Sequence, residues 1–249
     1  MSPAWKPRCP APACPHKEIL GDPVFHGLDH VVVELNGAGG CLEIRPTGLA
    51  PMQVPGLTLE AWVRPGSQEG AGSQTLVNLP LKDRPLCLQL LPRGAWELGQ
   101  ERTWVRANGV RPGRWQHLAG VCRRDGLALY RNGSPVASLR TPTRLVLPGE
   151  AVVGARPRGD GLADCYRGQL ARVRLWARAL GDEEIRLAMA GRLPAEPGQL
   201  ADWPLDEGFG IVSPNRAPAA QVEPPATPFG DARFRIVCGW PDYVIARIA

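Results

Sequence analysis

Short runs of alternating apolar and polar residues, separated by turn-forming residues, recur along most of this chain. The run Leu57–Val63 is one example, and Arg64-Pro65 ends it. Because successive side chains of a strand point to opposite faces of a sheet, alternation with a period of two predicts a strand with one buried face. Many short runs with regular turn signals predict an all-β sandwich or barrel.

The clearest turn signal lies near the middle of the chain, where Asn132-Gly133 separates the alternating runs Leu127–Tyr130 and Val136–Leu139. Asn-Gly favours a type I′ turn, because both central residues of that turn need a positive φ. We therefore expect a β-hairpin here. The high content of Gly (29) and Pro (27) in 249 residues fits many turns and few long helices.

Two further elements are expected towards the C-terminal end. Residues 168–176 alternate and predict a strand with Leu170, Arg172, Arg174 and Trp176 on one face and Ala171, Val173 and Leu175 on the core face. The two arginines are expected to lie along a solvated sheet face. One short helix is expected between Gly181 and Gly191, because acidic residues in its first turn suit the helix dipole.

The two ends of the chain differ in composition from the middle. Residues 1–22 are Pro-rich and predict an irregular arm, residues 23–210 a β-sandwich, and residues 211–249 a Pro-rich extension with a final strand at Arg233–Val237. The first 20 residues lack the apolar stretch of a secretory signal. The sequence contains no apolar run of about 18 residues, so membrane insertion is not expected. We expect a cytoplasmic protein, or one exported by another route.

Seven cysteines are scattered along the chain, and their odd number argues against a secreted disulfide framework. We expect free thiols in a reducing compartment. Cys9, Cys14 and His16 lie close in sequence, but a structural zinc site needs four ligands. Cys122 and His117 are five positions apart and are expected on opposite faces of one strand, which disfavours thiol catalysis.

Five segments in this order resemble the laminin G-like domains of the concanavalin A-like lectin/glucanase superfamily. They are Leu57–Val63, Trp115–Ala119, Leu129–Gly133, Tyr166–Leu180 and Leu200–Gly210. The resemblance covers roughly residues 31–210 and implies a two-sheet antiparallel jelly-roll β-sandwich with one short helix near the C-terminal end. It also implies a buried position for Trp115.

The resemblance implies a non-catalytic module that binds a glycan or a protein. A structural scaffolding domain and a divergent glycoside-processing enzyme are the alternatives. Related glucanases place their acids as Glu-x-Asp-x-x-Glu on one strand, and no such run occurs here. Asp202, Asp206 and Glu207 have the wrong spacing and are expected to be surface turn acids. We therefore do not expect an enzyme.

The loop from Arg156 to Tyr166 is the richest in polar groups and is the predicted binding surface. Its candidate ligand-binding residues are Arg156, Arg158, Asp160, Asp164 and Tyr166. Calcium is the candidate cofactor, with Asn36, Asp160 and Asp164 as possible ligands, because hard cations take oxygen ligands from loops. A ligand is expected to be anionic or calcium-bridged. No nucleic-acid partner is expected, because a mild positive charge does not fix a partner and the dense arginines are expected to lie along a solvated sheet face.

Overall fold

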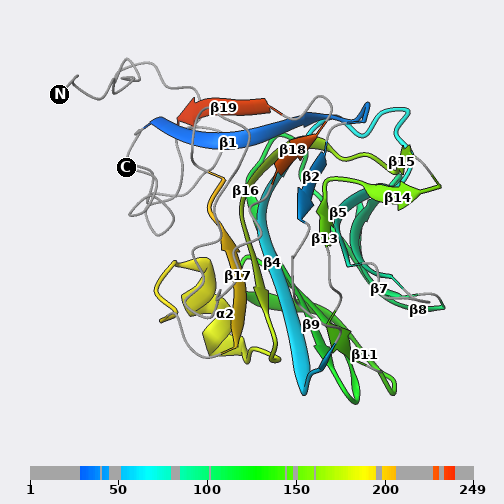
Figure 1. The fold of residues 1–249 in the computed structure, drawn as a ribbon, viewed down its shortest axis with the longest axis vertical. Coiled ribbons are helices and arrows are strands. Elements are labelled where there is room, and N and C mark those ends of the chain that lie inside the picture. Colours follow the sequence, from blue (N-terminus) through cyan, green and yellow to red (C-terminus); the bar gives the residue numbers. More distant parts are fainter. Residues whose placement is uncertain are drawn as a thin grey trace.

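The computed structural model describes residues 29–39, 41–44, 52–79, 85–100, 102–143, 145–147, 151–159, 161–194, 198–205, 227–229 and 233–238. These residues form two antiparallel sheets that face each other, with one helix outside them, as Figure 1 shows. Within them, the predicted all-β sandwich with one short helix is confirmed. The predicted arm at 1–22 lies outside the described residues. No helix in the described part of the chain is long and apolar enough to cross a membrane.

The first sheet has eight strands, in the order β11-β10-β9-β4-β16-β1-β19, with β17 also paired to β16. Their bounds are β1 (Asp29–Asn36), β4 (Gly56–Pro65), β9 (Gln116–Arg123), β10 (Gly126–Arg131), β11 (Ser134–Arg140), β16 (Arg167–Trp176), β17 (Gln199–Trp203) and β19 (Arg233–Cys238). Strand β19 covers the segment for which the sequence predicts a final strand, and it pairs with β1.

The second sheet has seven strands, in the order β18-β2-β13-β5-β6-β7-β8. Their bounds are β2 (Cys41–Ile44), β5 (Gln74–Leu79), β6 (Leu86–Leu91), β7 (Ala95–Gln100), β8 (Thr103–Asn108), β13 (Ala151–Val153) and β18 (Thr227–Phe229). Two small ribbons complete the described fold. They pair β3 (Met52–Gln53) with β12 (Val146–Leu147), and β14 (Arg156–Arg158) with β15 (Gly161–Ala163).

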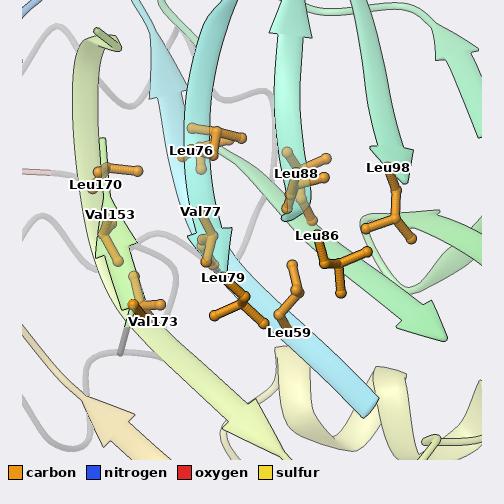
Figure 2. Packing of buried hydrophobic residues seen from close by; sticks show 14 of the residues in the cluster. Leu59, Leu76, Val77, Leu79, Leu86, Leu88, Leu98, Val153, Leu170 and Val173 are labelled. Atoms are coloured by element: carbon orange, nitrogen blue, oxygen red, sulfur yellow. The ribbon is translucent and has the colours of Figure 1, made fainter. Parts of the chain in front are cut away.

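The main hydrophobic core lies between the two sheets, where alternate residues of each strand meet. Leu59 of β4 and Val173 of β16 come from the first sheet, while Leu79, Leu88 and Leu98 come from the second (Figure 2). All five side chains are almost completely buried. The alternation seen in the sequence thus separates core-facing residues from those on the outer face of each sheet.

Three tryptophans of the family-like segments are buried, as expected for Trp115. Trp115 is 7% exposed, Trp62 is 3% exposed and Trp176 is fully buried. The predicted hairpin is also confirmed, because Asn132 and Gly133 have φ values of 50° and 76° between β10 and β11. The Asn132 side chain then accepts a hydrogen bond from the His117 backbone N–H at 2.9 Å, which ties this turn to β9.

The expected alternation of β16 is wrong at one position. The pairing of β16 with β4 shifts between Ala171 and Val173, and Arg172 has a φ of 38°. A bulge of this kind adds one residue to a strand, so the side chains on its two sides change faces. Leu170 therefore packs in the main core with Val173 instead of sharing a face with Arg174.

The expected short helix is α2 (Asp182–Met189). The Glu184 carboxylate accepts a hydrogen bond from the Gly181 backbone N–H at 2.7 Å, which satisfies one free donor at the helix start. Ile185 and Ala188 pack against Val121 and Trp176, which point outward from the first sheet. The helix therefore covers the outer face of the first sheet.

Candidate functional site

Charged side chains on the outer face of the first sheet form a buried network beneath α2. His117 Nε2 lies 3.0 Å from Glu60 Oε2, and Arg174 Nε lies 2.5 Å from Glu60 Oε1. Trp176 Nε1 donates to Glu60 Oε1 at 3.3 Å. A guanidinium N–H of Arg174 also donates to the Ala188 carbonyl of α2. Since these side chains are almost fully buried, the network connects sheet and helix and is closed to ligands.

The pKa values of Glu60 and His117 follow from their burial and from the Arg174 guanidinium beside them. Burial by itself would raise the pKa of Glu60, but Arg174 and His117 together lower it from 4.5 to about 2. Burial lowers the pKa of His117 below 6.5, although its hydrogen bond to Glu60 acts in the opposite direction. The described network therefore holds an ionised Glu60 balanced by Arg174, with a neutral His117.

Two predictions are wrong here: that the arginines of β16 lie on a solvated face, and that Asp202 is a surface acid. Arg172 is 7% exposed and Asp202 is 3% exposed. Arg172 donates from Nε to Asp202 Oδ1 at 3.0 Å and from Nη2 to Asp202 Oδ2 at 2.9 Å. Strand β17 pairs with β16 and brings the carboxylate to the guanidinium, so both charges are buried together. Asp206 and Glu207 lie outside the described residues.

The outer face of the second sheet carries a row of polar side chains. Antiparallel pairing places Gln89 of β6 opposite Glu97 of β7, and Glu97 opposite Arg106 of β8. The Glu97 carboxylate accepts hydrogen bonds from Gln89 Nε2 and Arg106 Nε. The Glu97 side chain is 3% exposed, whereas that of Arg106 is 63% exposed. The buried Glu97 carboxylate thus holds Nε of Arg106, while most of the Arg106 side chain reaches solvent.

An aromatic side chain lies beside this row. Trp104 of β8 is partly exposed and alternates with the core residue Val105, so it points to the same outer face as Arg106. Its partner across the pair is Gly99, which has no side chain. A Cβ on Gly99 would lie 2.1 Å from the Thr103 carbonyl oxygen, so only glycine fits there. This face therefore combines a partly exposed indole with hydrogen-bonding groups.

The predicted binding loop is the β14–β15 hairpin and lies next to the second sheet, on the opposite side of the molecule from α2 (Figure 1). Arg156 Nη2 lies 2.5 Å from Asp164 Oδ2. The Thr75 backbone N–H of β5 donates to the Asp164 carbonyl at 2.7 Å. Burial raises the pKa of Cys87 on β6 to about 12, and the nearby charges of Arg156, Asp164 and Glu97 also act on this thiol. The hairpin therefore lies against β5, the strand that pairs with β6 of the polar row.

The other predicted site residues differ in how exposed they are. Tyr166 is fully buried in the main core, and burial raises its pKa well above 10, so its side chain does not reach the binding surface. Arg158 is exposed, and Asp160 lies outside the described residues. Asn36 is exposed, and its side-chain oxygen accepts a hydrogen bond from the Ala38 backbone N–H at 2.8 Å.

The structure brings Arg156 and Asp164 together but forms no group of three or more His, Cys, Asp or Glu residues suited to a metal ion among the residues that it describes. Sequence reasoning missed Gln89, Glu97, Trp104 and Arg106. Their outward positions could have been read from the alternation of three neighbouring strands. The expected separation of His117 and Cys122 is confirmed, since Cys122 packs in the main core and His117 contacts Glu60 on the outer face.

Free thiols are found at the four cysteines whose side chains the structure describes. Cys41, Cys87 and Cys122 are buried, and Cys165 is partly exposed. The zinc candidates Cys9, Cys14 and His16 lie outside the described residues.

Comparison with known proteins identifies the fold. A laminin G family model, described as the concanavalin A-like lectin/glucanases superfamily, matches residues 36–186, more than half of the chain. No curated protein matches the chain by sequence.

Two solved structures are similar to this chain at low sequence identity. A protein of Bacteroides ovatus ATCC 8483, proposed to bind carbohydrate, is 15% identical, with a TM-score of 0.66; the match covers 84% of this chain but only 60% of the other. The native heptameric SAP-like pentraxin of Limulus polyphemus is also 15% identical, with a TM-score of 0.58; that match covers 86% of this chain and 97% of the pentraxin. At this identity the two structures support the fold alone.

Proposed function

Because this chain belongs to the concanavalin A-like lectin/glucanase superfamily, we propose that it is a non-catalytic module that binds a glycan. The observation that carries the proposal is the outer face of the second sheet, where Trp104 and the Gln89–Glu97–Arg106 row lie together. A Bacteroides ovatus protein of similar fold is itself proposed to bind carbohydrate, and we propose the same class of ligand here.

The chemistry of this face suits a sugar. A sugar ring presents apolar C–H groups on its faces and hydroxyl groups around its edge. The partly exposed indole of Trp104 can cover the apolar face, because it offers a large rigid surface at little cost in entropy. Gln89 and Arg106 can bind the hydroxyl groups, and their bonds to the buried Glu97 hold them in position before the ligand arrives.

The β14–β15 hairpin is the second part of the proposed site. Arg156 and Asp164 are both partly exposed and lie close to the second sheet, while Arg158 is exposed at the end of β14. We expect an anionic or a calcium-bridged ligand to contact this hairpin. Calcium ligation by Asn36, Asp160 and Asp164 stays a prediction, and Tyr166 is omitted because its side chain is buried.

The charged groups of this face fit binding better than hydrolysis. Glycoside hydrolysis needs two carboxyl groups that can exchange protons on either side of the scissile bond. Glu97 is held by Arg106, and Asp164 is held by Arg156. In each pair a carboxylate oxygen is already occupied by a guanidinium, so these carboxylates serve as anchors and are poorly placed to act on a glycosidic bond.

A glycan array with the purified protein tests the proposal, and Trp104→Ala is the decisive variant. We expect wild type to bind at least one glycan and Trp104→Ala to lose about tenfold or more in affinity. Leu139→Ala is the matched control, because Leu139 is an exposed apolar residue on β11 of the first sheet. Wild type that binds no glycan, or a Trp104→Ala variant that binds as well as wild type, would count against the proposal.

A further inference from the structure

Two guanidinium–carboxylate pairs lie at the proposed binding face, and each leaves guanidinium N–H groups uncommitted. Arg106 bonds to Glu97 through Nε. Arg156 pairs with Asp164 through Nη2. Within the described part of the chain, neither guanidinium makes a further hydrogen bond or ion pair, and the unbonded Nε of Arg156 is buried. Each pair therefore combines a neutralised carboxylate with N–H groups that are available to a ligand.

We propose that Arg106 and Arg156 take the place of a divalent cation on this face and bind the oxygen atoms of the ligand directly. The inference rests on the proposed function and specifies how the ligand is held. A calcium ion needs about six to eight oxygen ligands, usually including carboxylates. Glu97 and Asp164, the carboxylates described here, already contact a guanidinium. A cation would have to displace that guanidinium before it could bind.

The geometry of arginine favours this role. A guanidinium presents its N–H groups as a planar fork that matches two oxygen atoms of a carboxylate or of neighbouring hydroxyl groups. Arg106 uses only Nε for Glu97, so both terminal nitrogens remain for the ligand, and 63% of its side chain is exposed. The ligand expected on this face is therefore a glycan with a carboxylate or paired hydroxyl groups.

Neighbouring hydrogen bonds hold the carboxylate partner of each guanidinium in place. Gln89 donates to the second oxygen of Glu97, which limits the movement of the carboxylate beneath Arg106. The Thr75 backbone N–H holds the Asp164 carbonyl, which fixes the residue that pairs with Arg156. Such fixed donors lose little freedom on binding, so they can replace a metal ion as an organising centre.

Calcium alone provides the first test, because it needs no identified glycan. Thermal unfolding is compared with and without about 10 mM Ca²⁺, a concentration that would fill even a weak extracellular-type site. We expect no calcium-dependent change in Tm for wild type. The double variant Arg106→Gln/Arg156→Gln should respond no more strongly than wild type, because Glu97 and Asp164 alone do not supply the about six to eight oxygen ligands that a calcium ion needs.

Two control variants show whether any response to calcium comes from this face. Arg106→Lys/Arg156→Lys keeps both positive charges and should remain insensitive to calcium. Arg114→Gln removes an exposed arginine from the turn before β9 and should also remain insensitive. A calcium-dependent rise in Tm for wild type overturns the proposal.

Any glycan found on the array provides the second test. Its binding to wild type should be unchanged by EDTA and should weaken about tenfold in Arg106→Ala. Loss of binding in EDTA overturns the inference, whereas wild type that binds no glycan overturns the proposed function. The calcium experiment still decides the role of the guanidinium groups in that second case, so the two failures can be told apart.

Discussion

The outer faces of the two sheets carry similar residues, yet one is buried and the other reaches solvent. Glu60, Arg174 and Trp176 on the first sheet lie beneath α2 and are almost completely buried. Glu97, Arg106 and Trp104 on the second sheet repeat the same three residue types, with Arg106 and Trp104 reaching solvent. The comparison shows that the same chemistry serves stability where a helix covers it and is available for binding where side chains reach solvent, as Arg106 and Trp104 do.

Replacing the central carboxylate should give the largest difference between the two faces. Glu60→Ala leaves the Arg174 guanidinium buried without its carboxylate, and we expect a loss of about 3–5 kcal/mol in the free energy of unfolding. Glu97→Ala leaves Arg106 mostly in water and should cost about 1 kcal/mol. Urea denaturation of both variants measures the difference, and equal losses would mean that the two faces are not distinguished by burial.

Substitution of one tryptophan on each face should give a smaller difference in the free energy of unfolding. Trp176→Phe removes buried volume and the hydrogen bond to Glu60, and we expect a loss of about 2–3 kcal/mol. Trp104→Phe should cost less than about 1 kcal/mol, because the Trp104 side chain is already partly in water. If Trp104→Phe proved as destabilising as Trp176→Phe, Trp104 would be a core residue and the proposed site would lose its aromatic surface.

The pH dependence of stability should come from the first sheet. The pKa of Glu60 is about 2 in the folded chain, so its contribution is complete above pH 4.5 and is lost as the pH falls from 4.5 towards 2. The folded pKa of His117 lies below 6.5, so its contribution is complete above pH 6.5 and declines as the pH falls below that value. Both groups therefore destabilise the fold in acid.

Urea denaturation between pH 8 and pH 3, about the range in which both groups titrate in unfolded chains, measures this effect. His117→Gln should lose the decline that begins near pH 6.5 and keep the one below pH 4.5. Stability that rises as the pH falls below 6.5 would contradict the neutral state assigned to His117.

Much of the fold could be predicted from the sequence, because strand alternation and turn chemistry are local. The Asn132-Gly133 turn and α2 follow from residues that are neighbours in the chain. The bulge at Arg172 could not be predicted, because it depends on how β16 pairs with β4. The boundaries at 22/23 and 210/211 stay predictions.

Less of the candidate site could be predicted, because it depends on register and on long-range cover. The hairpin with Arg156 and Asp164 was visible as a polar loop. The row of Gln89, Glu97 and Arg106 comes from three strands, and only their pairing shows that these residues meet. The burial of Arg174 depends on Ala188 of α2, a contact that alternation within β16 cannot show.

Arg106 should give the smallest effect on stability and the sharpest test of the open face. Its side chain is largely exposed, and Gln89 still donates to the buried Glu97 carboxylate when the guanidinium is removed, so Arg106→Ala should change the free energy of unfolding by less than about 1 kcal/mol. That small change should shrink further in about 1 M salt, because exposed charges are screened over a few ångströms. Arg174→Ala is the matched variant on the covered face. It should cost several times more and should respond little to salt, since its partner Glu60 is buried. Urea denaturation at low and high salt separates the two arginines, and a large, salt-insensitive loss in Arg106→Ala would show that the second sheet is covered as fully as the first.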